Sequence, residues 1–159
     1  MPSTAFDTSL GTCGISWEGA LITGFSLPPT AAPSIETPAF VSAVIAHVQA
    51  HLSGRLQDFS DLPYAWQQVT EFQRTVYQAA LQIGPGQTAT YGQLAQAIGQ
   101  PLAASRAIGT ALGQNPWPLL VPCHRFVGAD GRMTGFSAPG GIQTKLRLLT
   151  LEGSQLFAE

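Results

Sequence analysis

The proline-rich stretch from Pro28 to Pro33 most constrains the fold, because neither a strand nor a helix continues easily through it. Before it, residues 10–27 alternate apolar and polar side chains around a Glu18-Gly19 turn, which predicts a β-hairpin. After it, Thr37-Pro38 resembles a helix start, with threonine as N-cap and proline at the first helical position. Apolar residues then recur at helical spacing over 40–52. These segments together predict a small β/α unit.

The rest of the chain is predicted to be mostly helical. A helix over 70–83 begins at a threonine that can act as N-cap and ends at a Gly-Pro-Gly break. Thr90 with Gln93 is a capping-box signature for a short helix over 90–99, and another helix follows over 101–113. Two short helices joined by a tight glycine-containing turn form a helix-turn-helix pattern, which ordinary helical hairpins share.

These segments predict an α+β chain with two domains. The expected boundaries are a β/α domain over 1–60, a linker over 61–69, and a mainly helical domain with the helix-turn-helix over 70–159. Of the 159 residues, 45% are hydrophobic and 10% are charged, so a packed core is expected. The net charge is −2, so binding to nucleic acid would depend on where the 7 Lys and Arg residues lie.

The sequence also bears on the cellular location and on whether the protein needs a metal or cofactor. The first residues lack the cationic and apolar regions of a secretory signal, and no apolar run suits a membrane span. Cys13 and Cys123 are too few for a disulfide framework, so a cytoplasmic location is expected. His47 and His51 have the i, i+4 spacing of metal ligands, but no third ligand is evident. We therefore expect no metal and no cofactor. We also expect the protein to be a monomer.

The segment Val121-Pro122-Cys123-His124-Arg125 carries the clearest chemical signal. It places a thiol beside an imidazole and a guanidinium, directly after an apolar run. A thiol is a useful nucleophile only as a thiolate, and a neighbouring histidine and positive charge favour that form. From these residues alone, a buried structural cysteine beside a polar pair is the alternative interpretation.

A longer pattern surrounds the cysteine. It comprises Asn115, Pro116, Pro118, Pro122, Cys123, His124, Arg125, Gly140, Gly141, Lys145, Leu148, Leu149 and Glu152. This string resembles the alkylguanine-DNA alkyltransferases, also called methylated-DNA–protein-cysteine methyltransferases, whose active-site motif is Pro-Cys-His-Arg. The resemblance continues upstream through Phe72-Gln73-Arg74, Thr90-Tyr91-Gly92 and residues 105–109, and it covers about residues 70–153 well.

The resemblance implies a reaction and the residues that perform it. Cys123 would accept a methyl or other alkyl group from the exocyclic oxygen of alkylated guanine in double-stranded DNA, once and irreversibly. His124 would accept the thiol proton, and Glu152 would orient His124. Asn115 would support the turn around the cysteine, and Tyr91 would help guanine to leave by donating a proton or a hydrogen bond.

The resemblance also implies how DNA and the base are held. Arg106 would enter the duplex and fill the gap that a flipped nucleotide leaves. The small residues Ala104 and Ser105 would let this helix approach the minor groove, while Tyr91 packs against the flipped base and abuts a phosphate. The pocket residues implied by the resemblance are Pro118, Phe126 and Ser137. An Ala138-Pro139 insertion departs from the family pattern and predicts a longer, stiffer loop.

Two other functions remain open from the sequence. One is a lesion-binding alkyltransferase-like protein without activity, although such relatives lack the cysteine that is present here as Cys123. The other is a cysteine hydrolase that uses Cys123, His124 and Glu152, but the sequence specifies no oxyanion hole for it. Of the remaining residues, Arg125 is expected to form a structural ion pair and Cys13 to be a small apolar strand residue.

Overall fold

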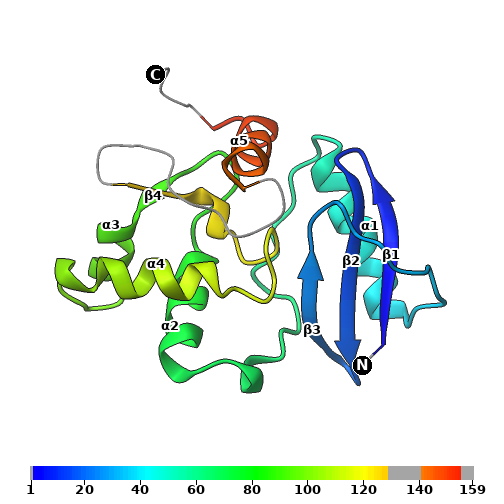
Figure 1. Ribbon diagram of the computed structural model, residues 1–159, viewed down its shortest axis with the longest axis horizontal. Helices are drawn as coiled ribbons and strands as arrows, with labels where there is room; N and C mark the ends of the chain where they lie inside the picture. Colours follow the sequence, from blue (N-terminus) through cyan, green and yellow to red (C-terminus); the bar gives the residue numbers. More distant parts are fainter. Residues whose placement is uncertain (1, 129–140, 155–159) are drawn as a thin grey trace.

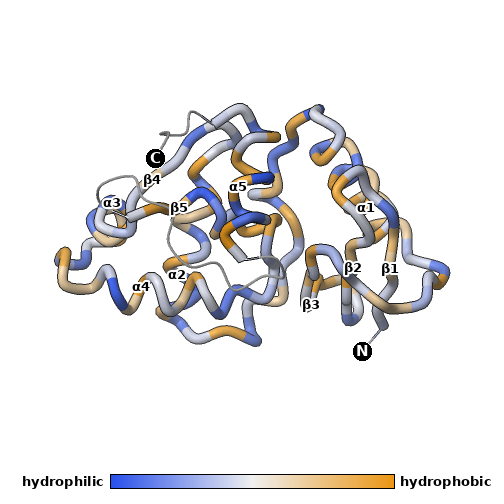
Figure 2. Tube along the Cα trace, turned by 45° about the horizontal axis from the view of Figure 1, so that its top comes forward, coloured by the Kyte–Doolittle hydropathy of each residue, from blue (hydrophilic) through white to orange (hydrophobic). Residues whose placement is uncertain are grey.

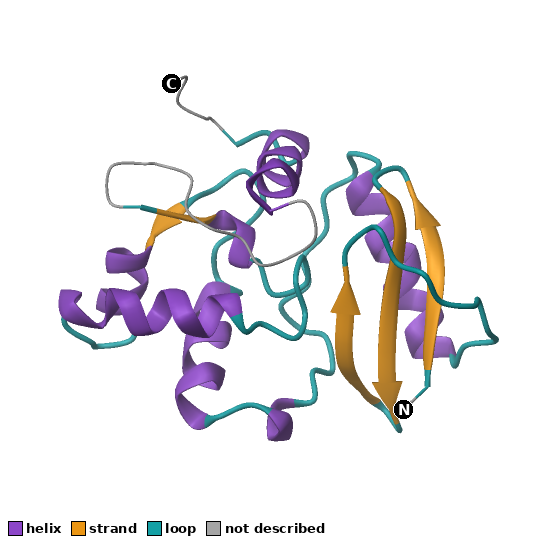
Figure 3. Cartoon of the chain, viewed as in Figure 1, coloured by secondary structure: helices purple, strands orange, loops and turns teal. Residues whose placement is uncertain are grey.

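The computed structural model describes residues 2–128 and 141–154 of the chain. A three-stranded sheet with one helix beside it forms the N-terminal half, and the other helices gather in a second half (Figure 1). Strands dominate the first half and helices the second (Figure 3). The predicted α+β class is therefore confirmed.

The N-terminal sheet is an antiparallel meander. It consists of β1 (Ser3–Thr8), β2 (Gly11–Glu18) and β3 (Leu21–Ser26), in the order β1-β2-β3. The predicted hairpin is confirmed as β2 and β3, and Gly19 in its turn adopts a φ of 59°, which glycine reaches without strain.

Strand β1 is absent from the sequence prediction. Its six residues contain one large apolar side chain, Phe6, so no alternating pattern marks them. The strand is fixed by its pairing with β2, in which Phe6 lies opposite Cys13. Cys13, Ile15 and Trp17 are all buried, as the alternation along this segment predicts.

Helix α1 (Ala39–Leu52) lies against one face of the sheet (Figure 1). Its inward side buries Val41, Val44, Val48, His51 and Leu52. The predicted threonine cap is wrong, because Pro38 occupies the N-cap position in an extended conformation and no side chain caps the helix. The Thr37 hydroxyl contacts the Ser42 hydroxyl at 2.5 Å instead.

Two of the three predicted helix starts in the second half are confirmed. Helix α2 (Glu71–Ala80) begins after Thr70, and helix α3 (Tyr91–Ala97) begins after Thr90, each with both hydrogen bonds of a capping box. Helix α2 ends at Ala80, before the predicted end at residue 83. The chain leaves helical geometry early because it turns towards the Gly-Pro-Gly break.

Helix α4 (Ser105–Gly113) follows a 3-10 turn, η2 (Leu102–Ala104), so the α-helix starts later than the predicted residue 101. Helices α3 and α4 contact each other, and this pair is consistent with the predicted helix-turn-helix. A Cβ on Gly92 would lie 2.9 Å from Leu102 Cδ2. The absence of a side chain at Gly92 therefore lets the start of α3 lie close to the Leu102 side chain of η2.

Three short elements surround the proposed nucleophile. Strand β4 (Ala89–Thr90) pairs in parallel with β5 (Phe126–Val127), and the 3-10 turn η3 (Cys123–Arg125) leads directly into β5. Helix α5 (Gly141–Leu151) contacts η3. The cysteine motif therefore lies between the β4–β5 strand pair and helix α5.

The segment predicted as a linker is structured where it meets the sheet. Tyr64 forms a β-bridge with Ile22 of β3, and the short 3-10 turn η1 (Trp66–Gln68) follows. Trp117 donates its indole N–H to the Ile22 carbonyl at 2.9 Å, and its ring contacts Tyr64. Buried side chains from both halves form one hydrophobic core, while the predicted domain boundaries stay a prediction.

Hydrophobic residues recur along the strands and the helices alike (Figure 2). Among residues 2–128 and 141–154, no helix has both the length and the apolar character that crossing a membrane requires.

Candidate active site

Asn115 holds the backbone that leads into Cys123. Its side-chain N–H donates to the Val121 carbonyl at 2.9 Å, and its side-chain oxygen accepts the Trp117 N–H at 2.9 Å. Between them, Leu119 adopts a φ of 79°, which is unusual for a residue with a side chain. The asparagine therefore closes a tight turn and fixes where the cysteine emerges.

Cys123 lies at the start of η3 and is nearly buried, with 8% of its surface exposed. Burial raises the pKa of the Cys123 thiol, and hydrogen bonding from Asn115 and the charge of Lys145 offset part of the rise. The resting thiol therefore keeps its proton, and a base must remove it before the sulfur becomes nucleophilic.

His124 is the adjacent base candidate, and it is fully buried. Its Nε2 lies 3.0 Å from each carboxylate oxygen of Glu152. The other ring nitrogen, Nδ1, is buried and has no hydrogen-bond partner among the residues that the structure describes. The carboxylate thus engages one side of the ring and leaves Nδ1 available to accept a proton.

The electrostatics keep His124 ready to accept that proton. Burial lowers the pKa of the His124 imidazole, Glu152 opposes the shift, and the charge of Arg125 lowers the pKa further. Burial alone would raise the pKa of the Glu152 carboxyl, but hydrogen bonds from its three partners hold it well below its usual range. A neutral imidazole therefore faces an ionised carboxylate.

Arg125 forms the ion pair that the sequence predicts. Its Nε and one terminal nitrogen donate to the two oxygens of Glu152 at 2.9 and 2.7 Å. Its other terminal nitrogen donates to the Ile83 carbonyl at 2.6 Å. The guanidinium thereby joins the cysteine motif to the end of the α5 segment and to the turn after α2.

The sequence prediction gives no role in the site to two residues that the structure places there. His51, noted there only for its metal-like spacing, donates from Nε2 to Glu152 at 2.8 Å. The described residues contain no group of three potential metal ligands. Lys145 is buried and donates to the Phe126 carbonyl at 2.5 Å. Burial lowers the pKa of Lys145 to about 8, and Cys123 opposes that shift.

Lys145, the single lysine of the chain, belongs to the family pattern in the sequence, but that pattern gives it no role. Its Nζ–H engages the carbonyl of Phe126, a residue that was assigned to the base pocket. Pro118 is partly exposed and forms a bridge with Val121. Ser137 and the Ala138-Pro139 insertion lie outside the described residues.

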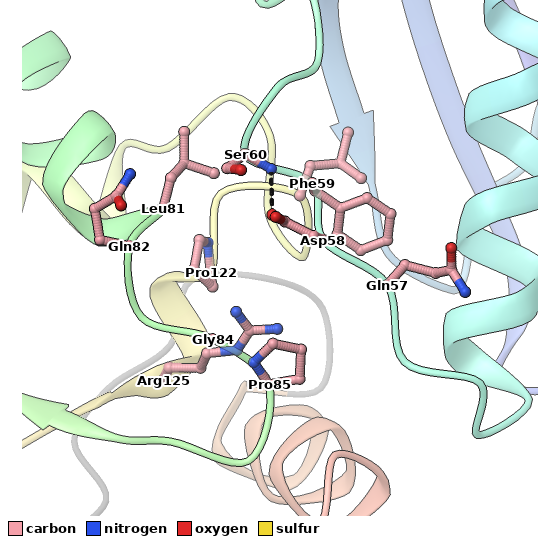
Figure 4. A pocket seen from close by; sticks show the side chains of 11 residues that line it. Gln57, Asp58, Phe59, Ser60, Leu81, Gln82, Gly84, Pro85, Pro122 and Arg125 are labelled. Atoms are coloured by element: carbon pink, nitrogen blue, oxygen red, sulfur yellow. Dashed lines mark hydrogen bonds between the residues drawn. The ribbon is translucent and has the colours of Figure 1, made fainter.

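A cavity of about 240 Å³ lies beside the cysteine motif (Figure 4). Its walls include Asp58 and Ser60 from the segment after α1, Pro85, and the motif residues Pro122 and Arg125. Cys123 is not among the lining residues, so this space differs from the expected base pocket.

The residues expected to contact DNA lie at the starts of two adjacent helices. Tyr91 is the first residue of α3 and is half-buried, while Arg106 is the second residue of α4 and is exposed. Ala104 and Ser105 immediately precede Arg106, and a Cβ on Gly92 would lie 3.9 Å from the Ser105 hydroxyl. The structure thus brings the Tyr91 and Arg106 segments to the starts of two contacting helices.

Comparisons with known proteins show which family the chain resembles. A family model described as 6-O-methylguanine DNA methyltransferase, DNA binding domain, matches residues 71–154. A Mycobacterium tuberculosis methylated-DNA–protein-cysteine methyltransferase is 37% identical over 96% of this chain and 93% of the relative. A Methanosarcina acetivorans protein of the same name is 42% identical over 76% of this chain and 74% of its own length. The crystal structure of Mycobacterium tuberculosis OGT in complex with DNA has a TM-score of 0.79 and 35% identity, and it covers 94% of this chain and 92% of that chain.

The site combines a buried cysteine with a buried histidine whose imidazole contacts a buried carboxylate, in a chain that also contains a pair of contacting helices. The Mycobacterium tuberculosis relative and the solved structure each match more than nine-tenths of this chain, so they identify one family. The chain belongs to the methylated-DNA–protein-cysteine methyltransferase family.

Proposed function

We propose that Cys123 is the alkyl acceptor of this chain and that alkylated guanine in double-stranded DNA is the donor. As its family membership indicates, the protein repairs DNA by direct alkyl transfer. The proposal assigns this activity to particular residues because three buried side chains can supply a nucleophile, a base and a group that orients the base: Cys123, His124 and Glu152.

The transfer is a single displacement at carbon. The Cys123 proton passes to Nδ1 of His124, and the imidazolium that forms is stabilised by the Glu152 carboxylate. The sulfur then forms a bond to the alkyl carbon while the bond from that carbon to the guanine oxygen breaks. The electron pair of the broken bond stays with guanine, and the product on the protein is a thioether. Because a thioether resists hydrolysis, each chain reacts once.

Guanine leaves as an anion unless a donor neutralises it. The Tyr91 hydroxyl is the proposed donor, because Tyr91 begins α3 and stays partly exposed beside the start of α4. Pro118, Phe126 and Ser137 are the proposed pocket residues.

The proposed DNA contact uses few positive charges. Arg106 fills the gap left by the flipped nucleotide, and its exposure at the first turn of α4 suits that role. Ser105, Ala104 and the N–H groups at the helix starts approach the backbone. Action as a monomer in the cytoplasm stays a prediction from the sequence.

Measuring the intact mass after incubation with duplex DNA that contains O6-methylguanine separates the three candidate functions. The proposal predicts one added methyl group per chain and no further uptake with excess DNA. A lesion-binding protein would bind this DNA without a change in mass. A hydrolase would turn over an activated ester repeatedly, and either result would refute the proposal.

A further inference from the structure

The Glu152 carboxylate receives a hydrogen bond from outside the cysteine motif. His51 lies in the last turn of α1, 101 positions before Glu152, and its Nε2 is 2.8 Å from the carboxylate oxygen Oε2. Both side chains have no exposed surface. The N-terminal β/α part of the chain therefore contributes directly to the group that orients His124.

The orientation of the His51 ring is fixed on both sides. The backbone N–H of Gln57 donates to Nδ1 of His51 at 2.9 Å. Because a backbone N–H can only donate, Nδ1 acts as the acceptor and Nε2 carries the ring hydrogen. The ring also lies against Phe59, with centroids 5.2 Å apart. His51 is therefore held as a hydrogen-bond donor aimed at Glu152.

The donors around Glu152 share a single negative charge. His51, His124 and Arg125 all approach Oε2, at 2.8, 3.0 and 2.7 Å respectively. Lys145 on α5 faces the Phe126 carbonyl, and Asp58 interacts electrostatically with Arg125. A donor that engages Oε2 reduces the negative charge that His124 experiences, and thus weakens the preference of its ring for a second proton.

We propose that His51 is a positioning residue for alkyl transfer, which holds Glu152 so that the carboxylate orients His124 while leaving the imidazole neutral. This inference rests on the proposed function only for its effect on rate. Its effect on the protonation of His124 can be measured without any DNA. The segment from α1 to Phe59 would then couple the folding of the N-terminal part to the competence of the site.

The test uses the full chain with three substitutions at one position. His51→Phe keeps a ring against Phe59 but removes the donor, and His51→Asn offers a polar group too short to reach Glu152. His51→Gln restores an N–H donor near the position of Nε2. His47→Phe is the matched control, because His47 is exposed on the same helix one turn earlier and bonds only to the Gln57 side chain among the described contacts.

Two readouts are followed across pH: the protonation of His124 by NMR, and the single-turnover rate of methyl transfer. Without the donor, the pKa of His124 should rise by about one unit, so the imidazole stays protonated, and unable to act as a base, up to a higher pH. The rate should fall about tenfold on the acid side of the profile and recover at high pH. His51→Gln should restore the profile, and His47→Phe should match the unsubstituted protein.

A merely structural role would give a different result. If His51→Phe and His51→Asn lower thermal stability but leave the His124 titration unchanged, His51 only joins α1 to the α5 segment and the proposal fails. Failure of the unsubstituted protein to take up methyl would refute the proposed function, while the titration would still decide the role of His51.

Discussion

Replacing Glu152 with glutamine keeps the size of the side chain and removes its charge. The carboxylate accepts from His124, from His51 and from Nε and one terminal nitrogen of Arg125, at distances between 2.7 and 3.0 Å. Leaving a buried arginine without its anion costs about 3–5 kcal/mol. For a chain of this size, that loss lowers the Tm by roughly 6–20 °C.

The loss should depend on pH in a defined direction. The pKa of Glu152 is held well below its usual range in the folded protein. The ionised carboxylate therefore contributes its full stabilisation of the folded state above the unfolded pKa of about 4.3. That contribution is lost as the pH falls towards the folded pKa. The stability difference between Glu152→Gln and the unsubstituted protein should therefore be largest near pH 7 and shrink below about pH 4.

Urea unfolding at a series of pH values, followed by circular dichroism, measures this difference. Glu36→Gln is the control, because Glu36 is exposed and its substitution should change stability by less than about 0.5 kcal/mol. A loss below about 1 kcal/mol at pH 7, or a loss of equal size at pH 3 and pH 7, would refute the account of the buried charge network. In the same variant, methyl transfer should slow most near neutral pH, because His124 becomes a weaker base.

Further outcomes follow from other parts of the site. Asn115→Ala removes both hydrogen bonds of the turn before Cys123, so we expect a loss of about 2 kcal/mol in urea unfolding and slower methyl transfer. An unchanged rate would mean that the turn does not position the thiol. Arg106→Ala should impair repair of duplex DNA far more than reaction with the free alkylated base, and equal losses would place Arg106 outside the duplex. Because Arg106 is the only cation between Thr90 and Gln114, binding to unmodified duplex should weaken with a log–log salt slope of about −2 to −3. A slope steeper than about −5 would reveal a basic surface elsewhere.

Local signals explain what the sequence predicts well. The capping boxes at Thr70 and Thr90 depend on residues three positions apart, so their pattern is readable without the fold. The β2–β3 hairpin is equally local. The His124–Glu152 contact was expected only because a family motif links residues that lie 28 positions apart.

Non-local contacts explain what the sequence does not predict. The His51–Glu152 hydrogen bond joins residues 101 positions apart, and His51 has the appearance of any helical histidine in the sequence. Strands β4 and β5 have two residues each and exist only because they pair in parallel with one another. The burial of Lys145 likewise depends on where α5 contacts the cysteine turn.

The position of the transferred methyl group tests the central claim most directly. After the full-length protein reacts with duplex DNA that contains O6-methylguanine, its peptides are separated and the modified residue is located by mass spectrometry. The account predicts one methyl group per chain, on the sulfur of Cys123, and no uptake by the Cys123→Ser variant. Methyl on Cys13, or continued turnover of DNA by protein that is already modified, would contradict it.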